Sequence, residues 1–199
     1  HLSPYGLRTL LEADIPLHVP CRKTRPNGPG LPESAKIFKS AVFTIDDLTI
    51  LPVKVSHAPG FITYGFVVQA SRMESRPFKF CFFTDLGRWD EAIVQHLVNC
   101  DFAFLECNHD RELLRRFPNY ASRYHLSNPH TALLIRTFLA RSERLPQAIM
   151  LGHLSEDRNT PDLALAAVQT LLSRDPRWKS IPLLVAPRRA VAAAAGAWG

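Results

Sequence analysis

The segment from Lys79 to Gly87, Lys-Phe-Cys-Phe-Phe-Thr-Asp-Leu-Gly, constrains the fold more than any other. A run of aromatic, β-favouring residues that stops at glycine predicts a buried strand. Because such a strand is apolar on both faces, we expect it at the centre of a sheet. Its C-terminal tip presents Asp85 in a rigid position suited to chemistry. Two interpretations of Asp85 are open: a cap for a helix that begins near Trp89, or a carboxylate that bridges metal ions.

Length and composition predict a single globular domain over residues 1–199. The chain has 199 residues, of which 46% are hydrophobic and 21% charged, enough material for one core. The net charge of +6 and the pI near 9.4 favour a polyanionic partner such as nucleic acid, or serve only solubility. No apolar run reaches the roughly 18 residues that a membrane span needs, so no membrane partner is expected.

The cysteines indicate the redox compartment. The chain has four, Cys21, Cys81, Cys100 and Cys107, and no two of them form a Cys-x-x-Cys pair. Because most of them lie in apolar surroundings, we expect buried free thiols in a reducing compartment. The predicted localisation is therefore cytoplasmic.

Hydrophobic periodicity predicts strands first and then strands alternating with helices. The predicted strands lie at residues 15–19, 41–45, 48–55, 62–70, 79–83, 101–105, 147–151 and 181–186. One predicted helix ends near residue 13, and others span residues 90–98, 112–116 and 128 to about 141. A further helix is predicted to begin at residue 161, and the alanine-rich tail at 190–197 is a last candidate helix. Ser127 and Thr160 are predicted helix N-caps. The alternation indicates helices packed on a sheet.

Several predicted strands end in a side chain that can bind a metal ion. These ends carry His57, Asp85, the triplet Asn108-His109-Asp110, and His153. A single histidine or aspartate at a strand end is usually structural, but the recurrence in one chain favours a metal site. Imidazole and carboxylate together suit zinc, manganese or iron.

These motifs resemble those of a known family. Ser56-His57-Ala58-Pro59-Gly60, then Phe83-Thr84-Asp85-Leu86-Gly87, then Leu151-Gly152-His153-Leu154-Ser155 resemble, in this order, the later metal-binding motifs of the metallo-β-lactamase superfamily. Further segments resemble its YycJ (WalJ-like) branch: residues 105–110, His125-Leu126-Ser127-Asn128, and residues 152–159. The resemblance covers about residues 1 to 186.

The resemblance implies an α/β fold of four layers, an αββα sandwich with two sheets back to back and helices outside. The family's signature His-x-His-x-Asp-His should open the site, yet only His1 matches it, as its last histidine. We therefore expect a chain that is N-terminally incomplete and lacks the first strands and most of that motif.

The resemblance also implies a ligand set. His57 would serve the first metal, Asp85 would bridge two metals, and His1 and His153 would serve the second metal. The complete protein would hold two divalent ions, zinc or manganese, and this chain at most one, in the second site.

Other residues of the branch receive supporting roles. Asn108, His109 and Asp110 would orient the metal ligands by hydrogen bonds, without binding the metal themselves. His125 would donate a proton to a leaving group, or would be only a polar residue ahead of a helix.

The implied function is a metal-dependent phosphodiesterase, a 5′-to-3′ exonuclease on DNA. Arginines at 115, 116, 123, 136, 141 and 144 could contact phosphates. We see no interleaving of aromatic and basic residues of the kind that marks a groove for stacked bases. Two alternatives stay open: a hydrolase of a small cyclic phosphodiester, thioester or lactone, and a binding module that has lost its metal centre.

Overall fold

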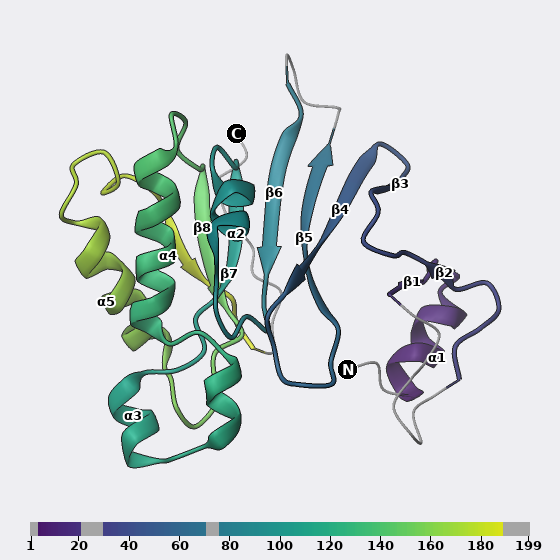
Figure 1. The fold of residues 1–199 in the computed structure, drawn as a ribbon, viewed down its shortest axis with the longest axis horizontal. Coiled ribbons are helices and arrows are strands. Elements are labelled where there is room, and N and C mark those ends of the chain that lie inside the picture. Colours follow the sequence, from purple (N-terminus) through teal and green to yellow (C-terminus); the bar gives the residue numbers. More distant parts are fainter. Residues whose placement is uncertain (1–3, 21–29, 71–75, 189–199) are drawn as a thin grey trace.

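The computed structural model describes residues 4–20, 30–70 and 76–188 (Figure 1). The helices are α1 (Pro4–Glu12), α2 (Glu91–Leu97), α3 (Arg111–Arg116), α4 (Asn128–Arg141) and α5 (Pro161–Leu172), with a 3-10 helix, η1 (Tyr120–Tyr124). The strands are β1 (His18–Val19), β2 (Lys36–Ile37), β3 (Phe43–Ile45), β4 (Leu48–Val55), β5 (Thr63–Ala70), β6 (Phe78–Phe83), β7 (Phe102–Glu106), β8 (Ala148–Gly152) and β9 (Leu183–Val185). His1, Cys21 and the predicted tail helix lie outside the described residues.

A mixed sheet organises the molecule. Its seven strands run in the order β3-β4-β5-β6-β7-β8-β9. Neighbours are antiparallel from β3 to β6 and parallel from β6 to β9. β6, the aromatic strand, is fourth of the seven, which confirms its predicted central position. The parallel pair β1-β2 lies with α1 beside the β3 edge (Figure 1).

The helices α2, α4 and α5 cover one face of this sheet (Figure 1). Alternate residues of the central strands point into that core, among them Cys81 and Phe83 of β6, both fully buried. α4 buries Ala132, Leu134, Ile135, Phe138 and Leu139, which recur at helical spacing. The core is therefore continuous from β4 to β8 beneath the helices.

The other face of the sheet is apolar as well, but only half-buried. Phe80 and Phe82 of β6 and Phe104 of β7 lie on it, and the rings of Phe82 and Phe104 stack with centroids 4.8 Å apart. None of the three belongs to the buried core cluster. The described residues thus provide one sheet layer and one helix layer of the expected sandwich, and the second large sheet is not among them.

Helix ends resolve one of the open interpretations. Asp90, not Asp85, caps α2, because its side chain accepts the Ile93 N–H. The Thr160 cap is confirmed by its bond from the Leu163 N–H. Ser127 does occupy the N-cap position of α4, yet its buried hydroxyl makes no hydrogen bond.

Three predicted strands are shorter than expected by two residues or more, and one of them is β3, which begins at Phe43 and not at residue 41. β1 covers only His18–Val19 and β9 only Leu183–Val185, because Pro16 and Pro182 have no N–H to donate to a ladder.

The three described cysteines are free and buried, as predicted. Burial raises the pKa of the Cys107 thiol to about 12, so this group stays neutral. No described helix combines the length and the apolar character that crossing a membrane requires.

Gly65 of β5 allows the close packing of the core against β6. A Cβ at this position would lie 2.2 Å from Cδ1 of Phe83 and 2.8 Å from the Phe82 carbonyl oxygen. We predict that Gly65→Ala lowers the free energy of unfolding by about 1–3 kcal/mol, because Phe83 is fully buried and cannot yield. Denaturant titration measures the change. Gly30→Ala is the control, since no atom lies within 4 Å of its Cβ position; equal midpoints for both variants would contradict the packing.

Candidate metal centre

Four strands deliver polar side chains to one edge of the sheet. β4 runs parallel to β6, since each is antiparallel to β5, and β7 and β8 continue in the same direction. His57 follows β4 by two residues, Asp85 follows β6 by two, and His153 follows β8 directly. Glu106 is the last residue of β7. The C-terminal ends of four strands thus place four candidate ligands together.

Asp85 lies between His57 and His153. Its Oδ1 is 3.6 Å from Nε2 of His57 and 3.9 Å from Nε2 of His153. Asp85 and His153 both adopt left-handed backbone conformations, with φ of 54° and 56°. Such a conformation costs free energy in residues other than glycine and is concentrated at functional sites. The structure brings together three of the four predicted ligands; His1 lies outside the described residues.

A hydrogen bond at Nδ1, on the side of the ring away from Asp85, fixes the orientation of His57. Its Nδ1 lies 3.1 Å from the carbonyl oxygen of Tyr124. Because a carbonyl oxygen can only accept, Nδ1 carries the proton, and the lone pair of Nε2 faces Asp85. The loop itself is held by the Gly87 N–H, which donates to the Ser56 carbonyl at 2.7 Å.

Glu106, which is not among the predicted site residues, contacts three other segments of the site. Its side chain is fully buried. Oε1 lies 2.6 Å from Nδ1 of His125 and 3.4 Å from Nδ1 of His153. Oε2 accepts the Leu86 N–H at 2.5 Å. A carboxylate at the end of an apolar strand was the available signal, because a buried charge needs partners.

These partners set the charge of the cluster. Burial by itself would raise the pKa of the Glu106 carboxyl, but hydrogen bonds from His125, His153 and Leu86 outweigh it and lower that pKa below its ordinary value. The hydrogen bond to Glu106 likewise raises the pKa of His153, with burial opposing and the charge of Asp85 assisting. Glu106 is therefore ionised at neutral pH.

His125 joins the two ends of the cluster. Its ring centroid lies 5.0 Å from that of His57 and 5.1 Å from that of His153. Two groups of three side chains could each hold a metal ion, because the donor atoms within each group lie within 4.8 Å of one another. The groups are His57, Asp85 and His125, and Glu106, His125 and His153. His125 belongs to both groups, so its position suits a ligand as well as the predicted proton donor.

The triplet after Glu106 divides into three roles. The Asn108 amide donates to the His153 carbonyl at 2.8 Å and so supports the loop that carries this candidate ligand. The Asp110 carboxylate instead caps α3 by accepting two backbone N–H groups. His109 is buried with no partner for Nδ1, and this burial lowers its pKa despite the nearby Glu106 charge. Asn108 is thus the member of the triplet that contacts a candidate ligand residue directly.

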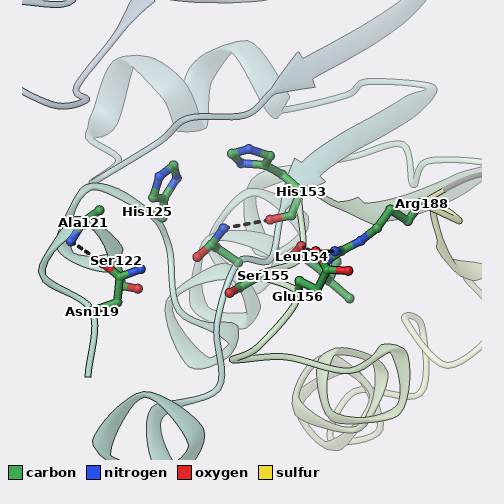
Figure 2. A pocket seen from close by; sticks show the side chains of 10 residues that line it. Asn119, Ala121, Ser122, His125, His153, Leu154, Ser155, Glu156 and Arg188 are labelled. Atoms are coloured by element: carbon green, nitrogen blue, oxygen red, sulfur yellow. Dashed lines mark hydrogen bonds and ion pairs between the residues drawn. The ribbon is translucent and has the colours of Figure 1, made fainter. Parts of the chain in front are cut away.

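An open pocket of about 300 Å³ adjoins the cluster. Figure 2 shows Asn119, Ala121 and Ser122 on one side of it, Leu154, Glu156 and Arg188 on the other, and His125 and His153 between them. The guanidinium of Arg188 pairs with Glu156 at 2.6 Å. The cluster is therefore reachable from solvent through a polar cavity.

Comparison with known proteins gives a structural likeness. No family model matches the sequence, and no curated protein matches it. The metallo-beta-lactamase fold protein YhfI from Bacillus subtilis is similar with a TM-score of 0.53 and 14% identity, over 76% of this chain and 52% of YhfI. The Zn²⁺-bound PqqB from Methylobacterium extorquens is similar with a TM-score of 0.50 and 11% identity, over 92% of this chain and 60% of PqqB.

The chain spans about half the length of YhfI and three fifths of that of PqqB. At such identities the likeness establishes architecture, and this architecture agrees with the mixed sheet and its covering helices. The chain has the metallo-β-lactamase fold.

Proposed function

We propose that the protein is a metal-dependent hydrolase that cleaves phosphodiester bonds in DNA. The observation that carries the proposal is the convergence of His57, Asp85, His125 and His153 around the buried Glu106 carboxylate. The net charge of +6 supports a polyanionic substrate. The resemblance to the YycJ branch supports exonuclease action on DNA.

The donor set fits a divalent metal ion. Each of three imidazoles has its Nδ1 directed at an oxygen, the Tyr124 carbonyl for His57 and the Glu106 carboxylate for His125 and His153. Such outer partners fix the tautomer and leave Nε2 free to bind metal. Nitrogen and carboxylate donors suit zinc and manganese. We further propose His1 as a ligand and at most one ion in this chain.

The chemistry divides between the ion and the protein. A divalent cation, when bound, supplies Lewis-acid polarisation of a phosphoryl oxygen and activates water. Asp85 holds a negative charge between two imidazoles. Glu106 orients the His125 ring through Nδ1, and this places the side chain in the cluster as the proposed proton donor to a departing alkoxide.

Assays of the full-length protein on linear DNA and on a small diester, bis(p-nitrophenyl) phosphate, test the function. Metal-dependent cleavage of DNA is the expected result. Cleavage of the small diester alone would support the small-substrate alternative, and cleavage of neither with no bound metal would support the binding module.

Asp85→Asn tests the metal ligand. Asparagine tolerates a positive φ as aspartate does, so the fold should survive, while the neutral amide binds a cation less well. In the full-length protein we predict loss of DNA cleavage and at least about tenfold weaker metal binding, measured by calorimetric titration. Asp46→Asn is the matched control, because Asp46 also has a positive φ, 50°, in the turn between β3 and β4. Unchanged metal affinity in Asp85→Asn would remove Asp85 from the site.

Glu106→Gln tests the role of the buried carboxylate. Three donors converge on the Glu106 carboxylate: the Leu86 N–H and the Nδ1 atoms of His125 and His153. A glutamine side chain has only one acceptor oxygen, so at least one of these donors would lose its partner. We predict metal affinity reduced by about 10–100-fold and a loss of roughly 1–3 kcal/mol in unfolding free energy. The exposed Glu112→Gln is the control. Wild-type values in both measurements would mean that Glu106 does not organise the histidines.

Salt dependence tests the nucleic-acid substrate. Each phosphate contact should weaken DNA binding by about threefold for a fourfold rise in salt, because bound counterions are released. Fluorescence anisotropy of labelled DNA across low to physiological salt measures the slope. Binding that is indifferent to salt would argue against DNA.

A further inference from the structure

An aromatic and basic group stands at the rim of the candidate metal centre. η1 carries Tyr120, which is 72% exposed, and the half-buried Tyr124, with Arg123 beside them. The Arg123 guanidinium carbon lies 3.4 Å from the ring centroid of Tyr120 and 4.5 Å from that of Tyr124. Arg123 also donates to the Tyr124 hydroxyl. Contrary to the sequence expectation, aromatic and basic residues do interleave, over this one short helix.

This group is joined to the metal centre by ring contacts. The Tyr124 ring lies 6.3 Å from the His57 ring, and the Tyr124 carbonyl fixes His57 through Nδ1. Phe61 lies in the loop that follows β4 and is 51% exposed. The centroid of its ring is 6.4 Å from that of the His57 ring. The neighbouring Asn119 and Ser122 line the pocket shown in Figure 2. Exposed rings thus adjoin the position where a substrate would react.

The charge of Arg123 is available, unlike that of several other arginines. Arg115, Arg141 and Arg144 pair with carboxylates, Glu112, Glu91 and Asp101. Within the described residues, Arg123 forms no ion pair with a carboxylate; its recorded contacts are to the two tyrosines. A guanidinium that lies over aromatic rings keeps its charge for a phosphate while it orients the rings.

We propose that Tyr120, Arg123, Tyr124 and Phe61 form a stacking platform that binds the bases of single-stranded nucleic acid beside the metal centre. The inference rests on the proposed phosphodiesterase function and adds its substrate class. Exposed aromatic faces with a basic group between them bind single strands by base stacking. A duplex keeps its bases stacked internally, and a small diester has no second base to reach Tyr120. The platform therefore selects single-stranded polynucleotides.

The test compares two labelled probes of equal length and charge, an oligothymidylate and an abasic oligomer. Binding to the whole 199-residue chain is followed by anisotropy in EDTA, so that no metal is needed. We expect tighter binding of the oligothymidylate, and Tyr120→Ala should weaken that binding at least about fivefold. Tyr120→Phe should retain it, because the ring remains. Tyr5→Ala is the control: Tyr5 is 81% exposed and lies on α1, away from the platform.

Equal affinity for the two probes, or Tyr120→Ala indistinguishable from Tyr5→Ala, would overturn the platform. The high exposure of Tyr120 makes misfolding of its variants a small risk, and a thermal melt checks it. The proposed function fails separately, through absent metal binding and absent cleavage by the full-length protein. Base-dependent binding with no cleavage would leave the platform standing and remove the hydrolase.

Discussion

A buried negative charge at the end of β7 governs the candidate site. Glu106 is fully enclosed, and an uncompensated carboxylate there would cost several kcal/mol. Its compensation comes from three separate segments: Leu86 after β6, His125 after η1, and His153 after β8. The charge is stable only when all three loops are in place. The same contacts turn two imidazoles toward Asp85, so the requirement to neutralise Glu106 also assembles the ligand cluster.

The sheet makes this arrangement rigid. β6 lies between β5 and β7 and is covered on its core face, so the position of Asp85 is set by strands that cannot shift singly. The left-handed conformations of Asp85 and His153 are held by this surrounding structure. The strained backbone of Asp85 and His153 and the buried charge of Glu106 therefore both lie where the C-terminal ends of four strands meet. That edge carries all of the candidate ligands within the described residues.

Sequence patterns predicted what local chemistry determines. The aromatic run predicted the central place of β6, and hydrophobic periodicity predicted the helix from residue 128 to about 141, which is α4. They left open whether Asp85 caps the following helix or binds metal, because the carboxylate that does cap α2, Asp90, follows it closely. The role of Asp110 was missed for the same reason: a carboxylate near a ligand motif is also an N-cap.

Glu106 and the tyrosines of η1 were missed because their meaning depends on contacts distant in the sequence. Nothing local shows that Glu106 faces His125, nineteen residues later, and His153, on another strand. Residues 120–124 have no helical or strand periodicity, so they read as a loop, and only the fold places Tyr124 against His57. Candidate ligands can be predicted from the ends of strands, whereas the roles of Glu106 and of the η1 tyrosines become visible only in the tertiary structure.

The two kinds of support around the cluster have different physical requirements. Metal ligands must be held to within a fraction of an ångström, and strand tips with buried hydrogen bonds supply that precision. A polymer substrate varies in base and conformation, and contacts that stack on any base tolerate the variation. Accordingly the candidate ligands His57, Asp85 and His153 lie within two residues of strand ends, while Tyr120 and Arg123 lie on a short, exposed 3-10 helix. Tyr124 links the two: its carbonyl oxygen fixes the candidate ligand His57, and its ring belongs to the proposed platform, so a nucleic acid bound there as proposed would lie beside the candidate metal centre.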